Sequence, residues 1–298
     1  MKCFYHMDMD GHCAGAIVNK AMNEGWAGEG EELTYIPINY NHVFPFDKIG
    51  KNELVVIVDF SLQPEEFEKL MGITNRLIWI DHHKTAIEKN AHLIEFIDGI
   101  RVSTGISGCE LTWQYFFPDK EMPLIVALLG DYDTWTFKYG NTTRYIQEAM
   151  TLYDTRPESA LWEEFFITKT NSPLIQKLRE QGSLCTTYRK NLNAKVVKAW
   201  AFKVDLWGYR CVACNQGSTS SQLFDSTNFP YDIMMPYVFD GAMWTVSLYT
   251  KDKDIDVSEI AKQYGGGGHR QAAGFQCGVL PWMEHECPFM SKKKREIE

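Results

Sequence analysis

The 298-residue sequence lacks any long apolar run, any excess of positive charge and any second closely spaced cysteine pair. A membrane helix needs about 20 consecutive apolar residues, and a signal peptide would need its apolar region where His6 and Asp8 stand. We therefore expect a cytoplasmic protein with no membrane partner. The formal net charge of −9 also disfavours long duplex nucleic acid as a partner, because binding many phosphates requires a large basic surface.

The eight cysteines are spread along the chain, and only Cys211 and Cys214 have the spacing of a metal or redox pair. A structural zinc site would need a second such pair. Without a secretion signal, reduced thiols are expected rather than disulfides. The sequence therefore predicts two ordinary, partly buried thiols at these positions.

Apolar sequence is sufficient for a substantial core, since hydrophobic residues make up 45% and charged residues 23% of the chain. At about 100–200 residues per domain, the length predicts two domains. The first is predicted to be α/β with a parallel sheet, because its apolar runs are of the continuous kind found in strands buried on both faces. The expected strands are 2–5, 54–58 and 77–80, and helices are expected after Gly11 and from Pro64.

The second domain is predicted to be a smaller α/β domain. A polar helical pattern over residues 173–200, interrupted at Gly182, predicts a helical connection to it. Beyond this helix, residues 201–215 and 243–250 alternate like strands, and Asp256 opens a further helix with a capping-box pattern. The basic tail 291–298 is predicted to be a solvated end.

Acids and histidines stand where the predicted elements of the first domain end. His6, Asp8 and Asp10 alternate after the first strand, so an extended backbone would point their side chains the same way. Because the carboxyl ends of parallel strands share one edge of a sheet, the acids of later segments should converge on them. These later residues are Asp59, Asp81-His82-His83, and Asp131 and Asp133 in a loop after the apolar segment 122–129.

Mixed imidazole and carboxylate ligands suit manganese, magnesium, cobalt or iron better than structural zinc. Taken singly, each motif has an ordinary alternative, such as a polar loop or a core histidine. Together they offer at least six ligands, enough for two ions. Two ions about 3.5–4 Å apart form a clamp that displaces phosphate esters, so the sequence predicts a two-metal phosphoesterase.

The ordered motifs also resemble a known family. In the order of the chain, they resemble the four motifs of the DHH phosphoesterase superfamily, in its nano-RNase or oligoribonuclease-like branch. The segment Gly265–Gly274 resembles the glycine-rich signature of the DHHA1 domain. The resemblance implies a DHH metal-binding catalytic domain over residues 1–180 and a DHHA1 substrate-binding domain over residues 181–298. The four motifs are His6-x-Asp8-x-Asp10-Gly11, Asp59, Asp81-His82-His83 and Asp131-Tyr-Asp133-Thr134.

The same resemblance implies two Mn²⁺ ions bridged by Asp59, with Mg²⁺ or Co²⁺ as alternatives. His83 would face the substrate as a catalytic residue, together with Asp81. The implied metal ligands are His6 and Asp8 for the first ion, and Asp10, His82 and either Asp131 or Asp133 for the second.

Substrate contacts are expected from the glycine-rich segment, because consecutive glycines expose backbone N–H groups to a phosphate. A plain turn is the ordinary alternative. Many DHHA1 domains carry an arginine near the position of Tyr249, which could instead stack on a base. Arg101 could donate to a phosphate, although the ordinary capping of a nearby helix start explains its region equally well. The expected substrate-binding residues are Gly265, Gly266, Gly267, Gly268, His269, Arg270, Tyr249 and Arg101.

The function predicted from these observations is hydrolysis of short RNA or dinucleotides to nucleoside monophosphates. 3′-Phosphoadenosine 5′-phosphate and cyclic dinucleotides are further candidate substrates, and a homodimer is an open alternative to a monomer. Two other functions stay open. One is a small-molecule phosphatase such as a pyrophosphatase or polyphosphatase, and the other is a nucleotide-binding regulator without turnover.

Overall fold

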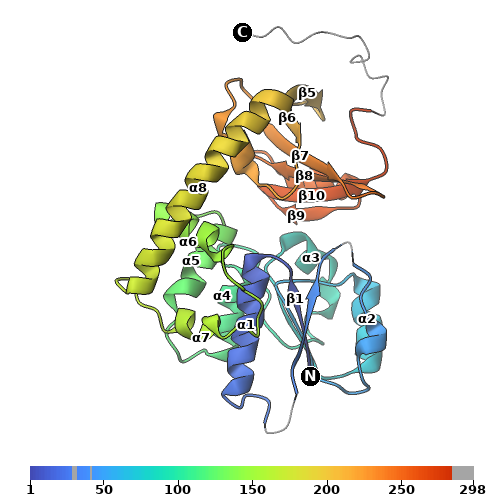
Figure 1. Ribbon diagram of the computed structural model, residues 1–298. Helices are drawn as coiled ribbons and strands as arrows, with labels where there is room; N and C mark the ends of the chain where they lie inside the picture. Colours follow the sequence, from blue (N-terminus) through green and yellow to red (C-terminus); the bar gives the residue numbers. More distant parts are fainter. Residues whose placement is uncertain (29–31, 41, 284–298) are drawn as a thin grey trace. The chain divides into compact units, whose positions relative to one another are not determined.

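The computed structural model describes residues 1–28, 32–40 and 42–283, so the basic tail lies outside the described residues. The chain divides into two compact units, Met1–Tyr188 and Arg189–Glu298. Each unit has its own sheet, which confirms the predicted fold class (Figure 1). The boundary lies inside helix α8, Pro173–Trp200. Among the described residues, no helix is long and apolar enough to cross a membrane.

The N-terminal unit is built on a parallel four-stranded sheet with the order β2-β1-β3-β4. Strands β3 and β4 are buried along their whole length, as their β-branched sequences predicted. The order reverses at β1, and ligands of open α/β sheets bind where the carboxyl ends of strands meet such a switch. The strands are β1 Lys2–His6, β2 Thr34–Ile38, β3 Val55–Val58 and β4 Leu77–Ile80.

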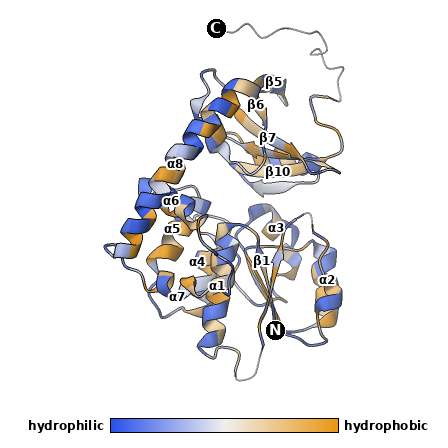
Figure 2. Ribbon diagram, viewed as in Figure 1, coloured by the Kyte–Doolittle hydropathy of each residue, from blue (hydrophilic) through white to orange (hydrophobic). Residues whose placement is uncertain are grey.

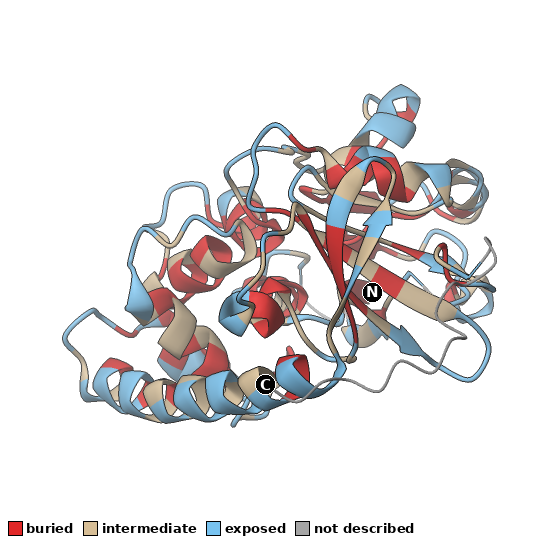
Figure 3. Ribbon diagram, turned by 90° about the horizontal axis from the view of Figure 1, so that it is seen from above, coloured by how far each residue is buried: buried red, intermediate tan, exposed pale blue. Residues whose placement is uncertain are grey.

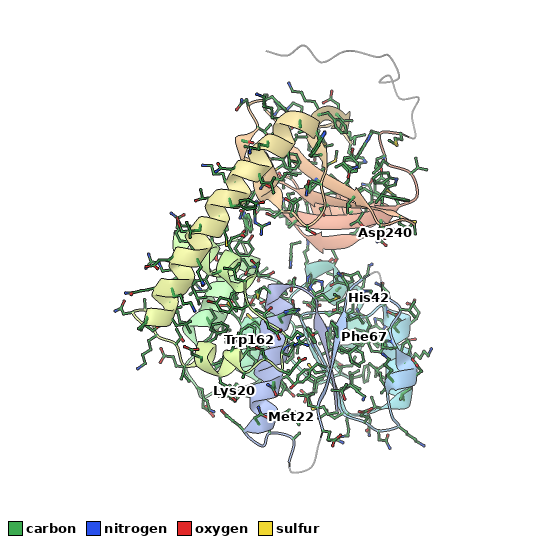
Figure 4. All side chains as sticks on the ribbon, in the orientation of Figure 1. Lys20, Met22, His42, Phe67, Trp162 and Asp240 are labelled. Carbon is green, nitrogen blue, oxygen red and sulfur yellow. The ribbon has the colours of Figure 1, made fainter. Side chains whose placement is uncertain are left out.

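Helices cover both faces of this sheet. On one face lie α1, α4, α5, α6 and α7, and on the other lie α2 and α3 (Figure 1). Trp162 belongs to the first core and Phe67 to the second, and they lie on opposite sides of the sheet (Figure 4). The helices are α1 Met9–Asn23, α2 Pro64–Ile73, α3 Lys84–Lys89, α4 Gly108–Phe116, α5 Leu124–Asp133, α6 Asn141–Met150 and α7 Leu161–Phe166, with short 3₁₀ turns at Phe46–Lys48 and Ala91–Leu93.

Apolar residues concentrate in the strands and on the helix sides that face them (Figure 2). The distribution of burial is similar, with buried residues in the strands and exposed ones mostly in loops and outer helix faces (Figure 3). Strand β2 was not predicted from the sequence. It contains Pro37 and lies at the sheet edge, which is where a strand tolerates a proline.

Helix α8 is continuous through Gly182, so the predicted interruption is wrong. A Cβ atom at position 182 would lie 1.7 Å from the carbonyl oxygen of Tyr145 at the middle of α6. The glycine therefore permits close contact between two helices and does not end one.

The C-terminal unit has a mixed six-stranded sheet with the order β5-β6-β7-β8-β10-β9. Helix α9, Val257–Gln263, packs on one face, and the end of α8 with the 3₁₀ turn Ser221–Ser226 packs on the other. Helix α9 begins where the sequence predicted, and Asp256 caps it by accepting a hydrogen bond from the Ser258 N–H. The strands are β5 Phe202–Leu206, β6 Tyr209–Asn215, β7 Ile233–Phe239, β8 Trp244–Tyr249, β9 Gly267–His269 and β10 Ala272–Cys277.

Cys211 and Cys214 occupy opposite faces of β6, in different core clusters. Both side chains are buried, and desolvation raises the pKa of the Cys211 thiol to about 12. Two thiols that point to opposite faces of a sheet cannot chelate one ion. They are core residues, as the sequence predicted.

Candidate metal centre

The first motif forms a strand–turn–helix and not the extended segment that we expected. Strand β1 ends at His6, and Asp8 is the N-cap of α1, where its side chain accepts a hydrogen bond from Gly11 N at 2.9 Å. Asp10 follows in the first helical turn. Gly11 has no room for a side chain, since a Cβ would lie 2.2 Å from the carbonyl oxygen of His6. The tight turn, rather than strand alternation, brings the three side chains to one place.

One group of ligand atoms gathers at this turn. His6 Nδ1 lies 2.9 Å from Asp8 Oδ2 and 3.7 Å from Asp59 Oδ2. A nitrogen or oxygen atom from each of the three residues lies within 4.8 Å of the others. This spacing allows one cation to contact all three.

A second group gathers around His82. Its Nε2 lies 3.1 Å from Asp59 Oδ1, 3.4 Å from Asp133 Oδ2 and 3.8 Å from Asp10 Oδ2. Ligand atoms of Asp10, His82 and Asp133 also lie within 4.8 Å of one another. The chain therefore offers two adjacent sets of hard ligands of the predicted types.

Asp59 lies between the two groups, with Oδ2 toward His6 and Oδ1 toward His82. Its backbone has φ of 54°, a left-handed conformation that costs free energy outside glycine and is typical of functional sites. Gly108 packs against this carboxylate, because a Cβ there would lie 2.5 Å from Asp59 Oδ1. Asp59 thus has the position that a bridging ligand requires.

Three buried carboxylate oxygens of the centre have no hydrogen-bond partner in the part of the chain that the structure describes: Oδ1 and Oδ2 of Asp59, and Oδ2 of Asp133. Burial and the neighbouring Asp10 carboxylate raise the pKa of both acids well above the ordinary value. Buried carboxylates normally find donors or cations. Divalent cations would satisfy these oxygens and remove the repulsion, so the residues fit such ions.

Asp10 is oriented by the N-terminus of α4. Gly108 N and Cys109 N donate to its two carboxylate oxygens at 2.7 and 3.2 Å, where the positive end of the helix dipole favours an anion. Ser107 and Glu110 form a reciprocal capping box on the same turn. The capping interpretation of this segment is therefore confirmed.

Asp81 orients the imidazole ring of His83. Its Oδ1 lies 2.7 Å from His83 Nδ1 and accepts from the N–H of His82 at 2.8 Å, while Ser61 Oγ donates to Oδ2. Although burial opposes ionisation, the contacts with His83 lower the pKa of Asp81 well below the usual range. A carboxylate in this position fixes the ring orientation and places the proton on Nδ1. The sequence did not reveal Ser61, which also accepts from Trp79 Nε1 at 3.0 Å.

The two acids of the fourth motif have different surroundings. They lie in the last turn of α5 and not in a loop, which corrects our expectation. Asp131 accepts hydrogen bonds from Lys138 N at 2.9 Å and from the hydroxyls of Thr136 and Thr143. Although burial opposes this, the hydrogen bonds lower its pKa. Asp133 is the acid that lies beside His82, so of our two alternatives the geometry favours Asp133.

Residues 3–130 match the model of the DHH family, N-terminal domain. This segment of the N-terminal unit is therefore similar to a DHH domain. The match extends from β1 into α5 and ends before Asp131 and Asp133, so it includes the first three motifs but not the acids of the fourth.

Two curated relatives extend the similarity beyond residues 3–130. One is uncharacterized protein R106 of Acanthamoeba polyphaga mimivirus, 29% identical over 85% of this chain and 62% of its own length. The chain thus spans less than two thirds of that relative. The other is oligoribonuclease NrnB of Bacillus subtilis (strain 168), 24% identical over 91% of this chain and 71% of its own length.

A solved structure supports the fold. The DHH domain of a member of the s1p family of ribosomal proteins aligns with a TM-score of 0.57 and 16% identity. The alignment covers 92% of this chain and 81% of that chain. At this identity the similarity concerns the fold alone.

Arg101 of the N-terminal unit has structural contacts, and its predicted contact with substrate stays a prediction. Its guanidinium donates four hydrogen bonds to backbone carbonyls and lies 5.2 Å from the centroid of the Trp79 ring. This fixes the loop that follows β4. The acceptors are the carbonyl oxygens of Trp79, Asp98, Ile94 and Ile97, at 2.9–3.0 Å.

The glycine-rich segment of the C-terminal unit is partly a strand and not the open loop that we expected. Gly267–His269 forms β9, paired with β10. A Cβ at Gly266 would lie 2.1 Å from the carbonyl oxygen of Gly274, and Gly268 has φ of 139°. Close strand pairing therefore explains these two glycines, and their contact with substrate stays a prediction.

The remaining predicted substrate residues have partners within the C-terminal unit. Arg270 Nε donates to the carbonyl oxygen of Lys253 at 2.9 Å, and the Arg270 guanidinium lies 3.5 Å from Asp256 Oδ2. Tyr249 packs on the cluster of β6 and β7 side chains beneath the end of α8. Burial raises the pKa of its phenol. Neither contact tests a role in substrate binding.

Proposed function

We propose that this protein is a two-metal phosphoesterase that hydrolyses short oligonucleotides to nucleoside monophosphates. The observation that carries the proposal is Asp59, whose two buried oxygens find no hydrogen-bond partner among the described residues and face two separate sets of imidazole and carboxylate ligands. A bridging carboxylate between two such sets is the arrangement of a two-ion clamp. Similarity to a protein named oligoribonuclease NrnB supports the substrate class.

The two ligand sets would hold two Mn²⁺ ions, with Mg²⁺ as an alternative. His6, Asp8 and Asp59 form the first set, and Asp59 is shared with the second set of Asp10, His82 and Asp133. Asp131 is left out, because its carboxylate is engaged by the backbone and hydroxyls of the following turn. The chemistry that such ions supply when bound is activation of water and neutralisation of phosphate charge.

The protein's own contribution is orientation and proton transfer. Asp81 holds His83 through Nδ1, which leaves Nε2 directed away from the carboxylate. With a proton on each ring nitrogen, His83 would donate the Nε2 proton to the oxygen of the leaving nucleoside and keep the Nδ1 proton toward Asp81. The turn at Gly11 and the N-terminus of α4 hold the ligands before substrate arrives, so binding costs little reorganisation.

The direct test is cleavage of a radiolabelled RNA dinucleotide by purified protein with Mn²⁺. Asp59→Asn should abolish release of monophosphate, while Asp119→Asn, at an exposed turn position after α4, should not change it. Parallel reactions with 3′-phosphoadenosine 5′-phosphate, a cyclic dinucleotide, pyrophosphate and polyphosphate define the preference. Faster hydrolysis of pyrophosphate or polyphosphate than of every nucleotide would refute the proposed substrate class. Hydrolysis of none of them would refute the enzyme.

A further inference from the structure

An aromatic turn directly follows the helix that presents Asp133. We define the aromatic turn as residues 134–140, which lead from α5 into α6. The ring of Trp135 lies 5.2 Å from that of Tyr132 and 4.8 Å from that of Phe137, in edge-on contacts. Trp135 is nevertheless 43% exposed. The hydrolysis mechanism proposed above does not use this exposed indole.

The backbone of the turn is strained. Trp135 has φ of 58° and Phe137 has φ of 51°, left-handed values that bulky residues rarely adopt. A helix end that needed only a left-handed residue would ordinarily use glycine. Here two aromatic residues occupy such positions, and the buried carboxylate of Asp131 holds the turn from inside. The structure thus maintains a costly conformation that keeps the Trp135 indole partly in solvent.

Cationic side chains accompany the aromatic rings. Lys138 Nζ lies 5.3 Å from the ring centroid of Tyr139, and the Arg144 guanidinium lies 5.5 Å from that of Phe137. Rings provide stacking faces that accept any nucleobase, and nearby cations favour the phosphate backbone. This combination is typical of surfaces that bind single-stranded nucleic acid.

The aromatic turn is adjacent to the metal centre along the chain. Trp135 follows Asp133 by two residues, so their Cα atoms lie within about 7 Å. Asp133 Oδ2 in turn lies 3.4 Å from His82 Nε2. A nucleotide with its phosphate at the centre could therefore bring its base to Trp135.

We propose that Trp135 is a substrate-specificity residue on which the nucleobase next to the scissile phosphate stacks. The inference rests on the proposed function for its substrate class and goes beyond it in assigning a base-binding residue within the N-terminal unit. The competing explanation is that the aromatic turn only ends α5. Stacking predicts a loss of binding confined to ligands that carry a base, whereas a structural role predicts a loss with every ligand.

The test is calorimetric titration of the full chain with Mn²⁺, using adenosine 5′-monophosphate and ribose 5-phosphate as ligands. Trp135→Ala should weaken binding of the nucleotide about tenfold, as expected for one stacked base, and leave ribose 5-phosphate unchanged. Trp135→Leu, which keeps apolar bulk without a ring face, should behave like Trp135→Ala, and Trp135→Phe should retain most of the affinity. Trp26→Ala is the matched control, since Trp26 is 42% exposed and packs on Phe116 at the far end of α1.

Circular dichroism of each variant reports whether it is folded, and Trp135→Phe keeps the test valid if the smaller substitutions disturb folding. Equal losses for both ligands, or no loss for either, would overturn the inference. Titration does not depend on turnover. If the wild-type protein cleaves no ester but binds the nucleotide through Trp135, the proposed function fails and the stacking residue stands. If the wild-type protein cleaves RNA dinucleotides while the Trp135 variants bind the nucleotide like wild type, the proposed function stands and the stacking role of Trp135 fails.

Discussion

Replacing Asp59 by asparagine should separate stability from activity. The substitution removes one negative charge from the centre while it preserves side-chain size. Asparagine also tolerates the left-handed backbone of this position better than most residues. In the metal-free protein, Asp59 is buried beside Asp10, and within residues 1–28, 32–40 and 42–283 neither of its oxygens has a hydrogen-bond partner. The charge therefore destabilises the metal-free fold, and its removal should stabilise it.

We expect metal-free Asp59→Asn to be more stable than the wild type by about 1–2 kcal/mol at pH 7. This is the usual gain when a substitution removes an unfavourable interaction, here a buried charge, from a functional site. In a unit of this size, that corresponds to a rise in Tm of roughly 2–8 °C. The sign follows from the raised pKa of Asp59. An acid whose pKa is higher in the folded than in the unfolded protein destabilises the fold once the pH rises above the ordinary pKa of 3.8. The stability gained by Asp59→Asn should therefore vanish at lower pH, where Asp59 is protonated in both the folded and the unfolded protein.

With metal, the order should reverse. Mn²⁺ at about 100 times its Kd should stabilise the wild type by roughly 2.7 kcal/mol, whereas Asp59→Asn lacks the shared ligand and should gain little. Loss of several kcal/mol of transition-state stabilisation should lower kcat/KM about 10³-fold or more. Thermal unfolding with and without Mn²⁺, together with the dinucleotide assay, measures both effects.

Asp131→Asn is the matched control, because this acid lies two residues from Asp133 but accepts hydrogen bonds from the aromatic turn. It should destabilise the protein by about 2–3 kcal/mol at pH 7. The lowered pKa of Asp131 means that its contribution is present above the ordinary carboxyl pKa and is lost as pH falls through the folded-state value. Two results would refute the assignment of Asp59 as a bridging ligand. One is a loss of stability in Asp59→Asn like that in Asp131→Asn, and the other is an Asp59→Asn variant that keeps both Mn²⁺-induced stabilisation and activity.

Three further predictions concern the surroundings of the centre. Asp81→Asn should lower kcat about 10- to 100-fold with little change in Mn²⁺ affinity, because it disturbs the orientation of His83 rather than a ligand; an unchanged pH–rate profile would argue against that role. Gly182→Ala should cost several kcal/mol in urea unfolding, since its Cβ would meet the Tyr145 carbonyl at 1.7 Å, and a neutral result would show that α8 and α6 can separate cheaply. Arg101→Ala should lower the free energy of unfolding by about 2–4 kcal/mol through lost charged hydrogen bonds and leave KM for a dinucleotide unchanged. A raised KM with unchanged stability would instead indicate that Arg101 contacts the substrate.

Much of the N-terminal unit could be predicted from local sequence. Continuous β-branched runs identified β3 and β4, and helical periodicity with start signals identified α1 and α2. The failures have physical causes. Strands β2 and β7 contain Pro37 and Pro236, which weaken any local strand signal. In β7 the pairing with β8 holds at Met234 and resumes at Tyr237, so the proline falls between these paired positions.

The sequence alone determined the chemistry of the candidate centre. Imidazoles and carboxylates are hard ligands whatever their surroundings, and their placement at the ends of strands and helices brings them to one edge of a parallel sheet. Only the tertiary structure separated Asp133 from Asp131, paired Asp81 with His83 and engaged Arg101 with backbone carbonyls. Some of these roles depend on partners distant in the chain, as when Asp133 meets His82, and others on how the backbone folds locally around Asp81, Arg101 or Asp131. Residue type and spacing specify which groups are available, whereas packing decides which group each one meets.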